Sequence, residues 1–387
     1  MHLNQQLCTF PVINTFFHCM MNDTSNQVPL LASRQHFKIL DGLRGIAAIA
    51  VVIFHFMEIA VPDYNDSFIA HAYLAVDFFF CLSGFVIAYA YDRRISNLGL
   101  LNFLKLRLIR LHPLVIIGAV IGLAVFVFDP FSNLYRLYAD STLLLFLSSG
   151  LLIPYPLVRE RYFNLFHLNP PTWSLFWEYI ANIGYGLFLY KAGKKVLWSV
   201  TIIAALSLIW AAKSFGNLGI GWGGDNYIGG AARIAFSFTA GILVYRLGWR
   251  IRTRLGFAAL GSILLAVFLL PFSEKYNWII DPAMAIFVFP ILVATGAGAA
   301  VHPATSRVCE LSGEISYPLY MIHYPFIWLF MSYVEKYKPG MSEMIVVMLT
   351  GVISLVLVAY LVLVYVDVPI RRYFKNKMTS RPALPVS

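Results

Sequence analysis

Two ionisable side chains, His55 and Glu58, interrupt the apolar run IAAIAVVIFHFMEIA at residues 46–60. Ionisable groups at membrane depth are costly, so they usually have a partner or a function. On a helix, the eleven steps from Arg44 to His55 end about 20° past three full turns and rise about 16 Å, so both side chains share one face. We expect Arg44 at the cytoplasmic surface and His55 beyond the midplane. An interfacial arginine and a histidine bonded to a neighbouring carbonyl fit the same pattern.

Asp77 opens the next apolar segment, VDFFFCLSGF, and is expected at a depth similar to that of His55. A carboxylate bonded to one ring nitrogen fixes the tautomer of a histidine and raises the basicity of the other nitrogen, which a general base requires. We therefore predict that Asp77 orients His55, with a helix N-cap as the alternative role for Asp77. Glu58, one turn beyond His55, is expected to reach the outer interface.

A pair of arginines, Arg107 and Arg110, lies within LLNFLKLRLIRLHP at residues 100–113, which predicts a helix on the cytoplasmic interface. Side chains three residues apart are neighbours on a helix, and two guanidinium groups suit phosphate because each presents a planar fork of donors. Contact with lipid headgroups is the alternative. In PPTWSLFWEYI, Ser174 and Glu178 are four residues apart where a span is expected to begin on the outer side. The chain has no Gly-x-Ser-x-Gly elbow there, so Ser174 is predicted to cap the helix rather than act as a nucleophile.

A second intramembrane histidine, His323, lies in GEISYPLYMIHYP at residues 313–325, with Tyr317 and Tyr320 on the preceding turns. Pro318 and Pro325 predict a bend or break in the helix. The segment is therefore either part of a site or a kinked packing helix.

The composition indicates an all-α integral membrane protein that crosses the bilayer several times. Of 387 residues, 59% are hydrophobic and only 12% are charged, against about 25% charged in soluble domains. The net charge of +10 is typical of cytoplasmic loops that face anionic lipid, so nucleic acid is not expected as a partner. The four cysteines have no metal-ligand spacing, which predicts neither a metal site nor a disulfide framework.

Ten segments are apolar and long enough to be candidate membrane spans, which need about 20 residues each. With both termini cytoplasmic, 21 of the 29 lysines and arginines lie inside, seven lie outside and Arg233 lies within a span, whereas counting residues 141–156 as a crossing divides the others evenly. We therefore predict ten transmembrane helices and a short re-entrant or interfacial segment at 141–156. The predicted spans are 40–60, 73–91, 112–128, 173–190, 196–212, 229–247, 255–272, 281–300, 314–333 and 343–366.

Six motifs in order give the chain a resemblance to the membrane acyltransferase-3 family, which includes bacterial O-antigen and exopolysaccharide O-acetyltransferases. They are DGLRGIAAIAVVIFHF, VDFFFCLSGF, RLIRLHP, WSLFWE, SYPLYMIHYP and DVPIRR, spread over residues 37–372. Trp177 and Tyr179 beside the acid, and Asp367 in place of a glutamate, depart from the family pattern. The implied organisation is a domain at 35–375 between tails at 1–34 and 376–387.

The resemblance implies transfer of an acyl group, usually acetyl, from acetyl-CoA on the cytoplasmic side to a carbohydrate or glycolipid in a bacterial cytoplasmic membrane. His55, Asp77 and Glu178 would be catalytic, and His55 would either deprotonate the acceptor or carry the acyl group. Arg44, Arg107 and Arg110 would hold the donor phosphates. The supporting residues would be Trp173, Ser174, Tyr317, Tyr320 and His323. A secondary transporter that uses His55, Asp77, Glu178 and His323 as a proton relay is the alternative.

Overall fold

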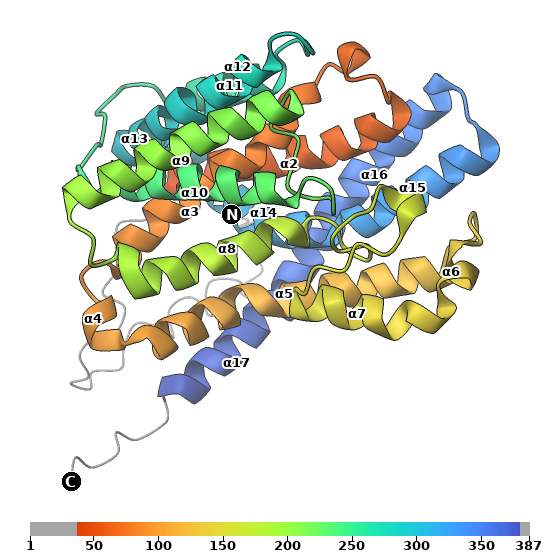
Figure 1. The fold of residues 1–387 in the computed structure, drawn as a ribbon, viewed down its shortest axis with the longest axis horizontal. Coiled ribbons are helices and arrows are strands. Elements are labelled where there is room, and N and C mark those ends of the chain that lie inside the picture. The colour runs from red at the N-terminus through yellow and green to blue at the C-terminus, as the bar shows by residue number, and fades with distance from the viewer. Residues whose placement is uncertain (1–36, 380–387) are drawn as a thin grey trace, which may run out of the picture. The chain divides into compact units, whose positions relative to one another are not determined.

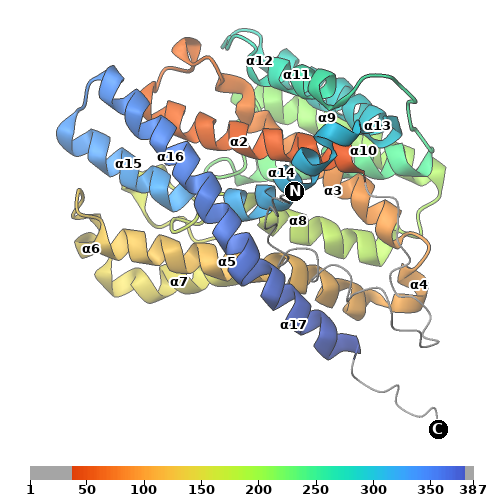
Figure 2. The ribbon, with the colours of Figure 1, turned by 180° about the vertical axis from the view of Figure 1, so that it is seen from behind.

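The computed structural model describes residues 37–379, and the helices that it contains run side by side as a bundle (Figure 1, Figure 2). The described part has no β-strand, and one isolated bridge joins Asn164 to Gly223. The first half contains α2 (Lys38–Ala60), η1 (Tyr64–Asp66), η2 (Ala70–Leu74), α3 (Ala75–Tyr91), α4 (Ile95–Leu98), α5 (Leu100–Phe128), α6 (Leu134–Leu137), α7 (Thr142–Leu151), α8 (Thr172–Gly184) and η5 (Tyr185–Leu189). The second half contains α9 (Lys194–Phe215), α10 (Tyr227–Arg246), α11 (Phe257–Phe268), α12 (Asn277–Ala283), η6 (Met284–Val288), α13 (Phe289–Gly298), α14 (Pro303–Ile322), α15 (Tyr324–Tyr337), α16 (Met341–Val362), η7 (Leu363–Asp367) and α17 (Val368–Thr379).

Seven helical stretches among the described residues are long and apolar enough to cross a membrane. They are Lys38–Ala60, Ala70–Tyr91, Leu100–Phe128, Lys194–Phe215, Tyr227–Arg246, Asn277–Gly298 and Met341–Phe374. The other three predicted spans correspond to α8 with η5, to the twelve-residue α11, and to α14 with α15, which are separated at His323. The chain is a multi-pass membrane protein, and the number of ten spans stays a prediction.

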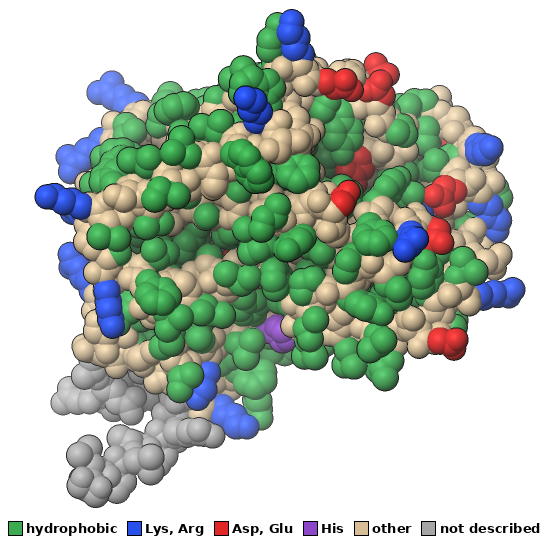
Figure 3. Space-filling view, viewed as in Figure 1, with side chains coloured by type: hydrophobic (Ala, Val, Ile, Leu, Met, Phe, Trp, Pro, Cys, Tyr) green, Lys and Arg blue, Asp and Glu red, His purple; other side chains and the backbone are tan. Residues whose placement is uncertain are grey.

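The outward face of α16 shows how the bundle meets lipid. Leu349, Ile353 and Leu357 follow one another at intervals of four residues, and each is about three-fifths exposed. Apolar side chains in such a row need a hydrocarbon environment. Figure 3 shows hydrophobic side chains across the middle of the molecule, lysines and arginines around its edges, and acidic side chains toward one end.

Two close helix pairs form the centre of the bundle, α2 with α14 and α3 with α10. Gly84 of α3 lies so near α10 that a Cβ atom there would be 2.0 Å from the carbonyl oxygen of Phe238, a contact that small residues permit between membrane helices. Arg44 contacts Ser316 and His55 contacts His323, so α2 and α14 run in the same direction. Along α3, Asp77 contacts Arg233 of α10 and the later residue Gly84 approaches the later residue Phe238. The helices α3 and α10 therefore also run in the same direction.

Two spans that run in the same direction must have an odd number of further crossings between them. The ten-span arrangement has this property, and an eleventh crossing at residues 141–156 would remove it. The helix found there, α7, has ten residues and is therefore about 15 Å long, half the thickness of a hydrocarbon core. The short length of α7 agrees with a segment that does not cross. That residues 141–156 are re-entrant or interfacial, and that both termini are cytoplasmic, stay predictions.

The prediction of a separate interfacial helix at 100–113 is wrong, because this segment is the first part of α5. Helix α5 continues through Pro113 for 29 residues, about 43 Å. Buried Phe103, Leu111 and Leu114 keep it packed on both sides of the proline, which explains why the missing amide does not end it. The predicted tail at 1–34 and residues 380–387 of the predicted tail at 376–387 lie outside the described residues.

Candidate active site

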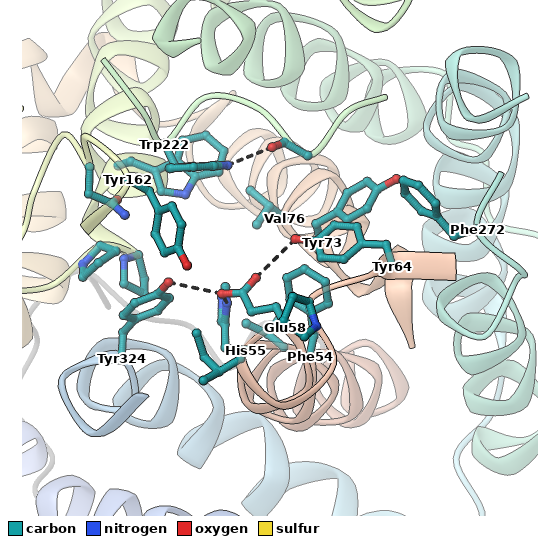
Figure 4. A pocket seen from close by; sticks show the side chains of 18 of the residues that line it. Phe54, His55, Glu58, Tyr64, Tyr73, Val76, Tyr162, Trp222, Phe272 and Tyr324 are labelled. Carbon is teal, nitrogen blue, oxygen red and sulfur yellow. Dashed lines mark hydrogen bonds and ion pairs between the residues drawn. The ribbon is translucent and has the colours of Figure 1, made fainter. Parts of the chain in front are cut away.

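A cavity of about 540 Å³ opens at the end of the bundle where α2 finishes. Its walls come from α2, the loop that carries η1, the segment before α8, the loop before α10 and the junction of α14 with α15. Figure 4 shows that aromatic side chains surround it, among them Tyr64, Tyr73, Tyr162, Trp222 and Tyr324. His55 and Glu58 lie on its floor.

Glu58, not Asp77, is the partner of His55. The His55 Nδ1 atom lies 2.9 Å from Glu58 Oε1, one helical turn away. Because a carboxylate oxygen accepts, Nδ1 carries the proton and Nε2 is left with a free lone pair. Tyr324 donates to Glu58 Oε1 at 3.2 Å and Tyr64 donates to Oε2 at 3.4 Å (Figure 4). The Glu58 carboxylate is therefore held in place by two phenols while it orients the histidine.

Tyr64 keeps its proton in this arrangement. Burial and the adjacent Glu58 carboxylate both raise the pKa of the Tyr64 phenol well above its ordinary value, since each disfavours a second negative charge. Tyr64 therefore stays a hydrogen-bond donor to Glu58 throughout the neutral and moderately alkaline range.

The prediction that Asp77 orients His55 is wrong because Asp77 is committed to another charge. Its carboxylate binds Arg233 of α10, with Oδ2 2.7 Å from Nη2 and 3.1 Å from Nε. The two side chains are 0% and 1% exposed. Arg233 also donates to the carbonyls of Tyr73 and Ile220. An arginine so deeply buried requires a carboxylate, and the pair joins α3 to α10 beneath the cavity.

His323 stacks on His55, with ring centroids 5.4 Å apart and an interplanar angle of 23°. Its Nδ1 atom donates to the carbonyls of Leu319 and Tyr320, at 3.1 and 2.9 Å, so Nε2 is unprotonated. That Nε2 atom is buried without a hydrogen-bond partner among the described residues. The helix breaks here because Pro325 has no amide for the carbonyl of Met321, which accepts a bond from Asn169 at 2.8 Å instead.

Trp173, Ser174 and Tyr320 support the cavity wall. The Ser174 and Tyr320 hydroxyls lie 2.9 Å apart and tie α8 to α14. Ser174 also donates to the carbonyl of Pro171, whereas α8 has no side-chain cap, so the predicted capping role is wrong. The Trp173 ring covers the guanidinium of Arg233 at 5.2 Å. Trp173 and Tyr320 line the cavity and Ser174 stands behind them.

Glu178, predicted to be catalytic together with His55, does not line the cavity that contains His55. Its Oε1 atom accepts from Arg107 at 2.9 Å and from Ser83 at 2.8 Å. Helix α8 runs inward from Ser174, so one turn places Glu178 deeper in the bundle. The four residues of the alternative relay are therefore not brought together: His55 contacts His323, while Asp77 and Glu178 each bind an arginine.

Four arginines gather at the opposite end of α2. Arg110 has Arg44, Arg107 and Arg371 as electrostatic neighbours. Arg44 donates to Ser316 at 2.8 Å and to the carbonyl of Gly313 at 2.5 Å. Arg371, in the segment DVPIRR, was not predicted to be a site residue.

Three members of this arginine cluster have carboxylate partners, and one does not. Arg44 lies 3.3 Å from Asp41, Arg107 binds Glu178, and Arg371 binds Asp367 at 2.5 Å. Within residues 37–379, Arg110 has no hydrogen bond or ion pair, and its side chain is exposed. Tyr317 stands beside the cluster and donates to the carbonyl of Leu111 at 2.6 Å. The cluster can therefore accept an anion at Arg110 without breaking an existing pair.

The described bundle thus carries the His55–Glu58 pair at one end of α2 and the arginine cluster at the other. No group of three or more His, Cys, Asp or Glu side chains in the described part is placed to hold a metal ion. A family model described as an acyltransferase domain, acyltransferase-3, matches residues 37–364. The chain belongs to this family, and its class is a transferase of acyl groups other than aminoacyl groups.

Two relatives show the extent of the similarity. Protein 2 in the picA locus of Rhizobium radiobacter is 35% identical over 192 residues, which are 47% of this chain and 97% of that protein. The O-acetyltransferase OatA of Staphylococcus aureus strain NCTC 8325 is 27% identical over 372 residues, which are 86% of this chain and 57% of that protein. The chain thus spans little more than half the length of OatA. No solved structure matches it.

Proposed function

We propose that the protein transfers an acetyl group from acetyl-CoA, bound at the arginine cluster, to a carbohydrate hydroxyl in the aromatic cavity. The observation that carries the proposal is the pairing of His55 with Glu58 at the cavity floor, on the helix whose other end presents Arg44. About 16 Å of helix separates these two side chains. Acetyl-CoA has a long, flexible arm between its phosphates and its thioester. Its phosphates can therefore bind the arginine cluster while its thioester reaches His55.

The donor end fits a polyanion. Arg110 is exposed and unpaired within residues 37–379, and three further arginines surround it. A bound phosphate would relieve their mutual repulsion and receive charge-assisted hydrogen bonds from planar guanidinium groups. We place this end on the cytoplasmic side of a bacterial inner membrane, because that orientation puts most of the lysines and arginines inside and acetyl-CoA is supplied there.

The acceptor end fits a sugar. Trp173, Trp222, Tyr64 and Tyr162 offer flat apolar faces with polar edges, a combination that packs against a ring while bonding its hydroxyls. OatA carries the name of an O-acetyltransferase, which agrees with a hydroxyl acceptor. A free sugar and a membrane-bound glycolipid present the same ring to the cavity.

The geometry supports a direct transfer. The Nε2 atom of His55 removes the proton from the acceptor hydroxyl as the oxygen attacks the thioester carbonyl, and Glu58 stabilises the imidazolium that forms. The C–S bond then breaks, and the proton passes from Nε2 to the departing thiolate, which leaves free coenzyme A and the ester. Attack by Nε2 on the thioester, to give an acyl-histidine that the hydroxyl then cleaves, uses the same atoms.

Acetyl-CoA turnover by the purified protein tests the proposal. Release of coenzyme A should require both His55 and a carbohydrate acceptor, with the label of radioactive acetyl-CoA recovered as a base-labile ester on that acceptor. A proton-coupled transporter would consume no acetyl-CoA under these conditions. A preparation that retains its fold and binds acetyl-CoA, yet releases no coenzyme A with any glycan of the bacterial envelope, would contradict the proposal.

A further inference from the structure

The charges that line the acceptor cavity are unbalanced. Three carboxylates line it, those of Glu58, Asp63 and Glu274, and its one cation is Arg233. Arg233 is 1% exposed, and its hydrogen bonds go to Asp77 and to two backbone carbonyls. Because that arginine is neutralised by Asp77, the three lining carboxylates determine the charge that a bound molecule meets.

Two of these acids stand at the mouth of the cavity. Asp63 and Glu274 are exposed, so they carry negative charge at neutral pH. Asp63 is held by the backbone and side-chain amides of Asn65, at 2.9 and 2.8 Å. Glu274 has no hydrogen bond or ion pair with any described residue. An approaching molecule therefore meets an uncompensated carboxylate before it reaches His55.

The cations nearest in the chain are occupied elsewhere. Lys275 follows Glu274 but lies over the ring of Tyr276, with Nζ 5.2 Å from its centroid. Arg161 binds Glu335 and Ser332 and covers Trp328. Neither Lys275 nor Arg161 lines the cavity, and among the described residues no lysine or arginine other than the paired Arg233 does so.

We infer that the acceptor is a neutral or amino-bearing sugar, and that uronic acid and phosphorylated sugars are rejected by Glu58, Asp63 and Glu274. This inference rests on the proposed function, because it names the class of carbohydrate that the cavity takes. The aromatic walls bind the ring whatever its charge, so the carboxylates act as the selective element. An amino group directed to the mouth would pair with Glu274, whereas a carboxylate there would face repulsion without a compensating donor.

Binding of matched monosaccharides, measured without acetyl-CoA, tests the inference separately from catalysis. The probes are methyl glucoside, methyl glucosaminide and methyl glucuronide, added to the purified full chain in a neutral detergent that contains no sugar. Saturation-transfer NMR at low ionic strength gives their relative affinities. Coulomb repulsion from two or three carboxylates about 7 Å away predicts that the glucuronide binds about 5- to 20-fold more weakly than the glucoside. The difference should shrink in high salt, because the mouth is exposed to solvent.

Substitutions at two exposed glutamates locate the effect. Glu274→Gln should reduce the ratio of glucoside affinity to glucuronide affinity at least about twofold. Glu343→Gln removes the same charge outside the cavity and should leave this affinity ratio unchanged. Trp222→Ala should weaken all three probes, which shows that they bind in the cavity. Equal or tighter binding of the glucuronide, or no binding of any probe, would overturn the inference. Loss of transfer with this selectivity intact would instead count against the proposed function alone.

Discussion

Replacement of Glu58 by glutamine removes one negative charge from beside His55 while preserving the shape of the side chain. In the wild-type protein, Glu58 Oε1 lies 2.9 Å from Nδ1 of the ring. The amide oxygen of glutamine can still accept that bond, but it cannot stabilise the imidazolium that forms when His55 takes a proton. Should the amide turn round, its NH₂ group would face Nδ1 and move the ring proton to Nε2, which abolishes the base.

The size of the effect follows from the kind of bond that is lost. A hydrogen bond to a charged group contributes about 1.5–3 kcal/mol, so the rate of acetyl transfer in Glu58→Gln should fall about 10- to 150-fold. This loss is smaller than the 10²- to 10⁴-fold contribution of a whole positioned base. The fold should survive, because Tyr324 can still donate to the amide oxygen, and the Tyr64 hydroxyl can accept from the amide nitrogen that takes the place of Oε2.

Acceptor-dependent release of coenzyme A by the purified variant measures this loss, and thermal unfolding checks the fold. Tyr324→Phe is the matched control, since it removes one donor to Glu58 and leaves the carboxylate and the histidine in place; its rate should fall less than that of Glu58→Gln. A Glu58→Gln protein with a normal unfolding temperature and a rate within twofold of wild type would refute the orienting role.

Three other predictions follow from the buried charges and the topology. Asp77→Asn leaves Arg233 buried without its counter-charge, so it should lower the free energy of unfolding by about 3–5 kcal/mol, seen as a lower unfolding temperature; an unchanged temperature would contradict this account of the pair. Arg110→Ala should weaken acetyl-CoA binding, measured by calorimetry, by about one to two orders of magnitude, with Arg110→Lys recovering little; unchanged affinity would make Arg110 an interfacial residue. An impermeant thiol reagent added to whole cells should label Lys338→Cys but not Lys194→Cys, and labelling of the latter would invert the assigned orientation.

The helices and the family were predictable because both depend on local features of the sequence. Long apolar runs with few charges specify membrane helices, and each predicted span coincides with a helix or a helix pair in the bundle. The six motifs identified the family that the family model then confirmed over residues 37–364. The break at His323 was also predictable, since Pro325 removes one amide from the helix.

The partner of His55 was the part that local reasoning assigned wrongly. Glu58 and Asp77 were both plausible acids, and the choice between them depends on Arg233, which is 156 residues beyond Asp77. A signal was nevertheless present. Arg233 is the one cation that the span assignment leaves inside the membrane. A buried arginine needs a buried carboxylate as its partner, so one of the predicted acids had to pair with it. Glu58 was already a helical neighbour of the histidine at i+3.

The depth of Glu178 could not be obtained from its own segment. A span boundary drawn at Trp173 put this acid near the outer surface, but α8 enters the bundle steeply and its first turn lies at the cavity wall. The continuous helix α5 brings Arg107 to meet it at 2.9 Å. Such a contact between helices 71 residues apart depends on packing, which no single segment encodes.

Transfer by His55→Ala tests the central claim most directly. The purified variant should bind acetyl-CoA with an affinity within about twofold of wild type, because the arginine cluster lies some 16 Å away along α2. Its single-turnover rate of acetyl transfer to the acceptor should fall about 10²- to 10⁴-fold, the contribution of a positioned base. Acetyl transfer at the wild-type rate by a folded His55→Ala protein would contradict the account, and His55 would then be a polar side chain packed between Glu58 and His323.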